Sequence, residues 1–138
     1  MKRTEARELL MQLIFQMEAQ KDYTKRTTDS FITENLFDSD QKEYFENVLE
    51  NYLAHRVEVD EKIESNSKSW KISRIAKVDL AVLRLAITEM FFMENAKKEY
   101  QIPENVAISE AVNIAKKYGE EDSNKFVNGI LGTLSKIN

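Results

Sequence analysis

Only three glycines and one proline interrupt a chain of 138 residues, and this shortage of turn-forming residues limits the fold more than any other feature. Sheets that form sandwiches or barrels need many tight turns, which glycine and proline usually provide. Long helices need few such residues, and the many Leu, Glu, Lys and Ala residues favour helix. The sequence therefore predicts an all-α protein, and its length fits one domain over residues 1–138.

Apolar residues recur at the helical spacing of three and four over most of the chain, which predicts about seven helices. A capping box of Asp40 and Glu43 is expected to open the third helix. Pro103 is expected in the first turn of the sixth helix, and Asp122 or Ser123 is expected to cap the last one. The expected helices span residues 4–19, 31–37, 40–53, 57–65, 75–94, 103–118 and 123–134, and a polar loop is expected over 21–30.

The helix expected at 75–94 is apolar on nearly all its faces, which is typical of a helix buried among others. Its apolar run is broken by Asp79, Arg84 and Glu89, so it is not a membrane span. The N-terminus carries acidic residues and does not look like a secretory signal. We therefore expect a cytoplasmic protein.

The net charge of −4 is unevenly distributed along the chain. Residues 34–64 carry ten acidic and three basic side chains, whereas the segments before and after this block are slightly basic. Most of the negative charge therefore belongs to one segment, and a basic face elsewhere can still bind nucleic acid.

The sequence offers little for catalysis. It has no cysteine, so thiolate nucleophiles and thiolate zinc sites are excluded, and its one histidine is His55. The acidic run from Glu120 to Asp122 could in principle hold a cation, but at the start of a helix such a run more often serves capping. We expect no enzyme activity, no cofactor and no metal site.

Two basic features could contact nucleic acid. Lys68, Lys71, Arg74 and Lys77 follow one another at intervals of three, with Trp70 among them and no acid from 65 to 78. Basic side chains beside an aromatic ring are typical of nucleic-acid surfaces. The alternative is that Trp70 fills the junction between two helices while the lysines are solvated.

The second basic feature is the pair Arg3 and Arg7, which share one face of the first helix. Glu5 and Glu8 dilute their positive charge, so ordinary pairing of surface charges is the alternative explanation.

The last helix contains Gly129 and Gly132 in its interior, where each glycine costs about 1 kcal/mol relative to alanine. Asn128 precedes the first glycine, and Lys125 and Phe126 lie one turn earlier. An amide, a lysine and an aromatic ring together suit single-stranded RNA, which is bound by stacking and by contacts to base edges. Close packing against the central helix is the other explanation for the glycines.

Three segments resemble the NusB family of transcription antitermination factors: WKISRIAKVDLAVLRLAITEM from Trp70, PENVAISEAVNIAKKYG from Pro103, and EDSNKFVNGIL from Glu121. The opening EARELLMQLIFQ also looks like the first helix of the family. The resemblance implies two three-helix halves with a small extra helix. It implies binding of boxA-type single-stranded RNA as a heterodimer with NusE, a small-subunit ribosomal protein. The pair would join RNA polymerase with other Nus factors; a homodimer is a further expectation.

Carried over residue by residue, the resemblance implies the following site residues. The RNA-binding residues would be Arg3, Arg7, Asp122, Lys125, Phe126 and Asn128. Asp79 matches an acidic position that faces NusE. Trp70, Arg74 and Arg84 match positions that are structural or partner-facing.

Two departures from the family pattern stand out. Thr4 and Glu5 make the N-terminal arm less basic than in arginine-rich members, and the linker over residues 93–103 is longer than usual. The acidic block and the diluted arm leave a second reading open, in which the protein is a protein-interaction scaffold with no significant RNA contact.

Overall fold

The computed structural model describes residues 1–35, 38–67 and 71–137, and every regular element in these ranges is helical. Seven α-helices are present in the described part, and the all-α prediction is confirmed. None of these helices has both the length and the apolar character needed to cross a membrane. The elements are α1 Arg3–Gln20, α2 Lys25–Asn35, α3 Ser39–Ala54, α4 Arg56–Asn66, η1 Ile72–Arg74, α5 Lys77–Phe91, η2 Lys98–Tyr100, α6 Glu104–Tyr118 and α7 Ser123–Ile137.

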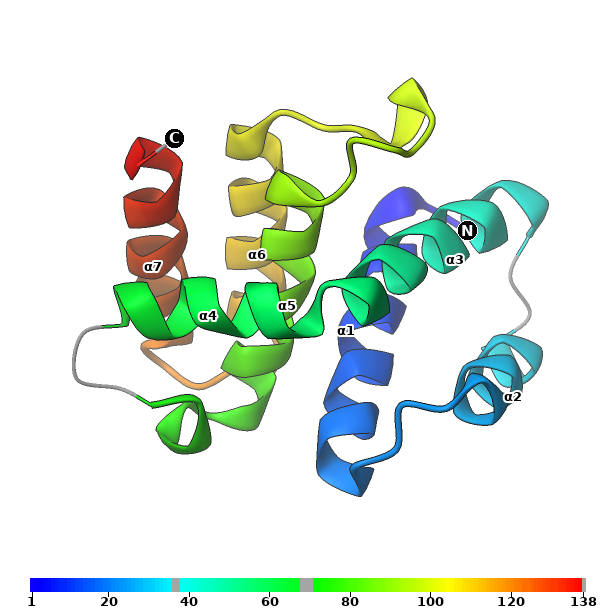
Figure 1. Ribbon diagram of the computed structural model, residues 1–138, viewed down its shortest axis with the longest axis horizontal. Helices are drawn as coiled ribbons and strands as arrows, with labels where there is room; N and C mark the ends of the chain where they lie inside the picture. Colours follow the sequence, from blue (N-terminus) through cyan, green and yellow to red (C-terminus); the bar gives the residue numbers. More distant parts are fainter. Residues whose placement is uncertain (36–37, 68–70, 138) are drawn as a thin grey trace.

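The helices fall into two groups that meet along α1 and α5 (Figure 1). Helices α1, α2 and α3 form one group, and α5, α6 and α7 form the other, with α4 lying across α5 and α7. Helix α1 runs beside α6 in the same direction, since Thr4 contacts Glu110 and Glu8 contacts Tyr118. This order matches the two halves and the extra helix that the resemblance implied.

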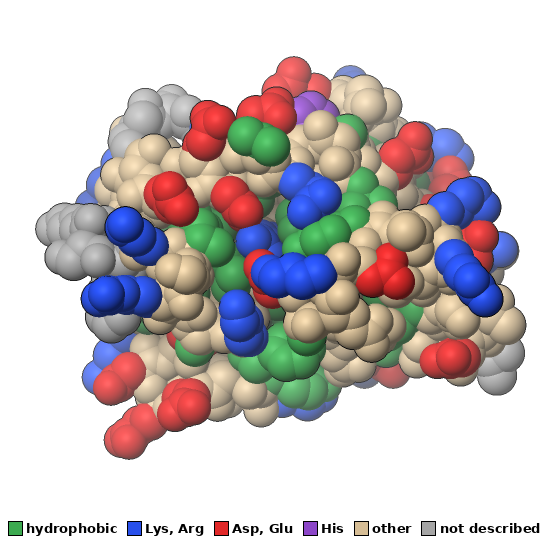
Figure 2. Space-filling view, turned by 60° about the horizontal axis from the view of Figure 1, so that its bottom comes forward, with side chains coloured by type: hydrophobic (Ala, Val, Ile, Leu, Met, Phe, Trp, Pro, Cys, Tyr) green, Lys and Arg blue, Asp and Glu red, His purple; other side chains and the backbone are tan. Residues whose placement is uncertain are grey.

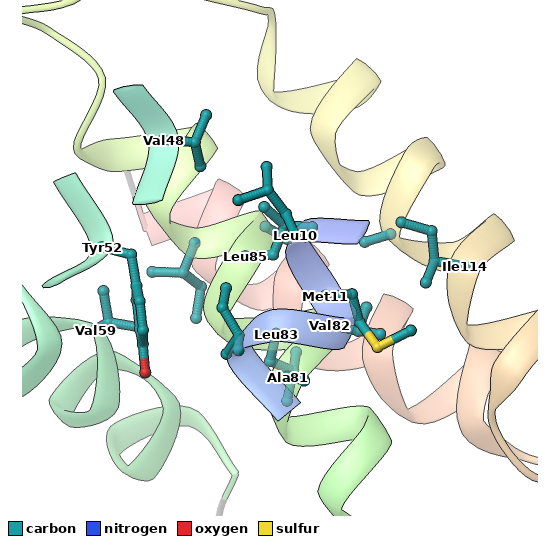
Figure 3. Packing of buried hydrophobic residues seen from close by; sticks show 14 of the residues in the cluster. Leu10, Met11, Val48, Tyr52, Val59, Ala81, Val82, Leu83, Leu85 and Ile114 are labelled. Atoms are coloured by element: carbon teal, nitrogen blue, oxygen red, sulfur yellow. The ribbon is translucent and has the colours of Figure 1, made fainter. Parts of the chain in front are cut away.

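Helix α5 is the centre of the core, as its apolar sequence predicted. All eleven residues from Asp79 to Glu89 are buried, so every face of this stretch packs against other elements. Figure 3 shows side chains from α1, α3, α4 and α6 gathered around it. Burying each large aliphatic side chain contributes about 1.5–3 kcal/mol, which makes this contact layer the main source of stability. The labelled members of the cluster are Leu10, Met11, Val48, Tyr52, Val59, Ala81, Val82, Leu83, Leu85 and Ile114.

Arg84 connects the central helix α5 to α1 and α4. Its guanidinium donates to Glu18 of α1 at 2.9 Å and, through two nitrogens, to both carboxylate oxygens of Asp60 of α4 at 2.9 Å. Burial alone would lower the pKa of Arg84, but the hydrogen bonds and charge of Asp60 raise it above its usual value. Arg84 therefore has a structural role inside the protein, because its donors are directed inward.

Several predicted helix boundaries were wrong. Helix α2 begins at Lys25 rather than at residue 31, because Asp22 accepts hydrogen bonds from Thr24 and Thr27 and organises the polar stretch before it. Helix α3 is capped by Asp38, whose carboxylate accepts from the backbone N–H of Gln41 at 3.0 Å, and not by Asp40.

The boundaries of α5 and α6 also shift. Helix α5 starts at Lys77 rather than residue 75 and ends at Phe91 rather than 94, because η1 and a turn after Phe92 take up the flanking residues. Pro103 is the N-cap of α6, with extended backbone, rather than its first helical residue.

The long linker between α5 and α6 packs back onto the first group of helices. Its Tyr100 is buried and makes an edge-on contact with Tyr44 of α3, with ring centroids 5.8 Å apart. Lys97 of the same linker forms an ion pair with Glu43 of α3. The linker thus connects α5 and α6 of one group and also packs against α3 of the other.

Candidate nucleic-acid interface

Arg3, predicted to contact RNA, is half-buried at the start of α1. Its guanidinium carbon lies 4.0 Å from the centre of the Tyr44 ring and 5.2 Å from that of Tyr100, and its Nε donates to Gln41 at 2.8 Å. Cation–π contacts of this kind contribute about 0.5–2 kcal/mol. The side chain is therefore held by α3 and the linker rather than extended into solvent.

Arg7 lies inside the protein. The residue is only 4% exposed, and its guanidinium donates to both carboxylate oxygens of Glu89 at 2.9–3.3 Å and to Glu110 at 3.3 Å. Tyr44 donates its hydroxyl to the same Glu89 at 2.8 Å. Burial alone would lower the pKa of Arg7, but the charge and the hydrogen bonds of Glu89 raise it above its usual value. The pKa of Tyr44 is raised as well, mainly by its burial. In this arrangement Arg7 joins α1, α3, α5 and α6 and presents no donor to solvent.

The other predicted RNA-binding residues gather where α7 begins. Asp122 directly precedes the helix and is exposed, and its backbone carbonyl accepts from the N–H of Phe126 at 3.1 Å. Lys125 and Asn128 are exposed, whereas Phe126 is partly buried against the core. Arg3 contacts α3 and the linker instead, so the structure places this group and Arg3 in two separate regions.

The two glycines of α7 do not mark a close packing contact. A Cβ added at Gly129 or at Gly132 would meet no atom within 4 Å. The packing explanation for them is therefore wrong. Both lie on the less buried side of α7, where they leave the helix surface next to Asn128 without side chains, whereas Ile130 and Leu131 between them are buried.

Asp79, predicted to face a protein partner, lies in the first turn of α5 and is 7% exposed. It lines a cavity of about 240 Å³ together with Arg74, Ile75, Ala76 and Phe126. Burial raises the pKa of Asp79 although a hydrogen bond from Ser123 opposes the shift, and the charge of Glu120 adds to it. The structure thus brings the predicted partner residue and a predicted RNA residue to one cavity.

Two exposed aromatic side chains near this region were not recognised as candidates from the sequence. Phe15 of α1 and Tyr118 at the end of α6 are each 36% exposed. Phe15 lies two turns beyond Glu8 on the same face of α1, toward the end where α6 stops. The available signal was that Phe15 lies off the apolar stripe of its helix.

Glu8 links this region to α1. Its carboxylate accepts from Lys117 at 2.9 Å and from the Tyr118 hydroxyl at 2.7 Å. Burial would raise the pKa of Glu8, but these two hydrogen bonds lower it overall, while Glu8 raises the pKa of both partners. The carboxylate of Glu8 therefore occupies the Lys117 ammonium and the Tyr118 hydroxyl, two donors that could otherwise bind a phosphate.

We call the end of the molecule that carries Phe15, Arg74, Lys77, Tyr118 and Lys125 the lower face. It is made from the end of α1, η1, the start of α5, the end of α6 and the start of α7 (Figure 1). Figure 2 brings this end forward and shows Lys and Arg side chains around and between exposed hydrophobic ones. Trp70 and Lys68 lie outside the described residues.

Neither catalytic nor metal-binding geometry is evident in the described ranges. The ring of His55 stacks on Phe92 with centroids 4.5 Å apart, and its Nδ1 lies 2.9 Å from the carbonyl oxygen of Asn51, which is a structural environment. No group of three His, Asp or Glu side chains that could hold a metal ion occurs among the residues described.

Comparison with known proteins identifies relatives over the whole chain. The model of the NusB family matches residues 4–136. The transcription antitermination protein NusB of Acetivibrio thermocellus is 42% identical over 137 residues, covering 99% of this chain and 90% of that protein.

Solved structures agree with this relationship. NusB of T. maritima superposes with a TM-score of 0.86 at 32% identity, over 99% of this chain and 92% of that one. A NusB chain from a crystal structure of antitermination factors NusB and NusE in complex with dsRNA superposes with a TM-score of 0.83 at 26% identity, over all of both chains. The chain described here belongs to the NusB family of transcription antitermination proteins.

Proposed function

We propose that this protein is a non-catalytic RNA-binding adaptor of transcription antitermination. It binds boxA-type single-stranded RNA in ribosomal RNA leaders together with NusE, and the pair joins RNA polymerase with other Nus factors in the cytoplasm. The observation that carries the proposal is the lower face, where exposed aromatic rings lie among lysines and an arginine. The solved structure of NusB and NusE in complex with dsRNA supports RNA as a ligand and NusE as a partner.

The chemistry of the lower face suits an unpaired strand. A base that stacks on an aromatic ring gains about 1–3 kcal/mol; Phe15 and Tyr118 supply two exposed rings, and Phe126 supplies a third that is partly buried. Lys77 and Lys125 supply the charge for phosphate contacts, which make binding salt-dependent. Exposed acidic side chains, including Glu120 and Asp122, weaken the positive potential of the lower face. NusE is therefore expected to add affinity by providing a second RNA-binding surface in the same complex.

The two N-terminal arginines take different parts in this proposal. Arg7 acts indirectly, by fixing α1 against α6 through Glu89 and Glu110. Arg3 contributes positive potential at the far end of α1 from the lower face, while its ring contacts limit its reach.

The proposal is tested by fluorescence anisotropy of a labelled boxA-like RNA with the protein alone and with NusE, at two salt concentrations. We expect tighter and salt-sensitive binding when NusE is added. Phe126→Ala is expected to weaken RNA binding without unfolding the chain, and Phe126→Leu, which keeps the apolar volume, is expected to weaken it as well because the stacking ring is lost. Val57→Ala, on the exposed face of α4, is the matched control and leaves binding unchanged.

The second candidate function is a protein-interaction scaffold without RNA contact. The acidic side chains of residues 34–64 favour it, because they repel nucleic acid over α3 and α4. NusE binding combined with no salt-dependent RNA affinity in either condition would support the scaffold and contradict the adaptor.

A further inference from the structure

A second cavity opens where α3 passes into α4, beside the end of α5 (Figure 1). Its volume is about 230 Å³, and its walls are formed by Asn51, His55, Phe91, Phe92, Glu94 and Asn95. Asp79 lies at the start of α5 and Phe91 at its end, so about 18 Å of helix separates this cavity from the position predicted to face NusE. The cavity is therefore also separate from the lower face.

The side chain of Asn51 presents an unoccupied acceptor to this cavity. Asn51 is 6% exposed, and its Nδ2 donates to the carbonyl oxygen of Asn47 at 3.1 Å and contacts the sulfur of Met93 at 3.5 Å. These contacts fix the amide, and its Oδ1 accepts from none of the described residues. Because Oδ1 is not fully enclosed, it faces the cavity that Asn51 lines. An acceptor in this position favours a ligand that brings a donor.

Aromatic rings form a second part of the lining. The ring of His55 stacks on Phe92 with an interplanar angle of 22°, and its Nδ1 is held 2.9 Å from the carbonyl oxygen of Asn51. Phe91 adds a third ring to the same cavity. Rings fixed in this way bind flat cations well, through stacking and through cation–π attraction.

The charges around the cavity are mostly negative. Glu94 in its wall is exposed, and its carboxylate forms no ion pair with any described residue. Glu50 next to Asn51 and Glu58 in the first turn of α4 are exposed as well. They belong to the acidic segment 34–64, for which RNA binding at the lower face provides no role. Such a surface repels phosphate and attracts a basic partner.

Two basic side chains of α4 lie nearby, but neither lines the cavity. The guanidinium carbon of Arg56 is 3.4 Å from the centre of the Tyr23 ring, and Nζ of Lys62 is 4.5 Å from the centre of the Phe91 ring. Both cations are thus held by rings of their own, and the acceptors of Asn51 and Glu94 stay open to a ligand.

A guanidinium combines the properties that these walls select. It is flat, it is always charged, and its five donors can reach an amide oxygen and a carboxylate at the same time. We propose that this cavity binds an arginine side chain of a basic protein partner, with the guanidinium against the His55 and Phe92 rings and its donors on Asn51 and Glu94. This inference goes beyond the proposed RNA binding and does not depend on it.

The test is a titration of the ¹⁵N-labelled full chain with the peptide acetyl-GSRRSG-amide, followed by NMR. Matched peptides carry lysine or citrulline in place of both arginines. We expect the arginine peptide to shift the side-chain amide signals of Asn51 and the backbone signals of His55 and Phe92. It should bind about three- to tenfold more tightly than the lysine peptide, because an ammonium has no flat face. The uncharged citrulline peptide should bind more weakly still.

Three variants locate the binding. Glu94→Gln should weaken binding of the arginine peptide about two- to fivefold, as expected for an exposed charge pair. Phe92→Leu should reduce the preference for arginine over lysine, because a stacking ring is lost. Asp40→Asn removes the same charge at the other end of α3 and is the matched control, with unchanged affinity. Thermal unfolding checks the fold of each variant, and the exposed Glu94 position carries the test if Phe92→Leu is unstable.

The contrary outcomes are distinct. Equal affinity for the arginine and lysine peptides, or an equal loss in Asp40→Asn and Glu94→Gln, would mean general attraction to acidic charge and overturn the inference. Shifts at Lys125 and Phe126 without shifts at Asn51 would place the peptide on the lower face and overturn it too. A boxA-like RNA that displaces the peptide and shifts the Asn51 and Phe92 signals would assign the cavity to nucleic acid instead.

Discussion

Replacing Arg7 by alanine separates a structural role from direct RNA contact. The Arg7 side chain is 5% exposed and that of Glu89 is 2% exposed, so the variant leaves a buried carboxylate with Tyr44 as its remaining donor. Removing one partner of a buried ion pair costs about 3–5 kcal/mol. Stabilities of natural domains are about 5–15 kcal/mol, so the loss is a large fraction of the total.

For a chain of this length, that loss corresponds to a fall in melting temperature of roughly 10–20 °C. Thermal and urea unfolding followed by circular dichroism measure it. Arg3→Ala, which removes a half-buried arginine that is held by rings and an amide rather than by an ion pair, is the control and should cost about 1 kcal/mol. The double variant Arg7→Met with Glu89→Leu should recover much of the loss, because no unpaired charge stays buried.

The opposite result would refute this reasoning. An Arg7→Ala protein that melts within a few degrees of the parent but no longer binds RNA would mean that the guanidinium leaves Glu89 and contacts the ligand directly.

Three further predictions concern single side chains. Glu8→Gln should raise RNA affinity a few-fold and make its salt dependence steeper by about one phosphate contact, because Lys117 and Tyr118 are released; equal or weaker binding would show that Glu8 only positions them. Gly129→Ala should stabilise the protein by about 1 kcal/mol in urea unfolding, since the new methyl group meets no neighbour; a lower midpoint would contradict this geometry. Burial raises the pKa of Tyr52 from 10.0 to about 12. The unfolded chain therefore loses this proton first, and the contribution of Tyr52 to stability is complete below pH 10 and falls as pH rises toward 12. Tyr52→Phe should make the urea midpoint less sensitive to pH over that interval, and an identical pH dependence in the two proteins would count against it.

The sequence was informative wherever one helix face decides the outcome. The periodic apolar residues located six of the seven helices, and the nearly continuous apolar pattern of α5 correctly predicted its burial; α2 covers residues 25–30, where a polar loop was expected. Errors arose at helix ends, where one side chain such as Asp38 or Asp22 fixes the boundary and several candidates lie close by in the sequence.

The site was harder to predict, because the partners of a side chain are remote in sequence. Arg7 and Glu89 are 82 positions apart, so the charge that withdraws this arginine from solvent could not be inferred from its own helix. The cavity lined by Arg74 of η1, Asp79 of α5 and Phe126 of α7 likewise depends on the fold, which brings these three elements together. Sequence motifs alone could not separate the buried Arg7 from an exposed arginine such as Arg74, because burial depends on the tertiary fold.

The linker that holds Tyr44 and Arg3 has a consequence for local unfolding. Helix ends usually fray independently of the rest of a protein, with a small opening free energy. Here Arg3 in the first turn of α1 contacts Gln41 and Tyr44 of α3, and both Arg3 and Tyr44 contact Tyr100 of the linker, so the first turn of α1 and the 98–100 turn share their contacts on α3. The backbone amides of both segments should therefore exchange with solvent deuterium as one cooperative unit, although one lies near the N-terminus and the other between the fifth and sixth helices.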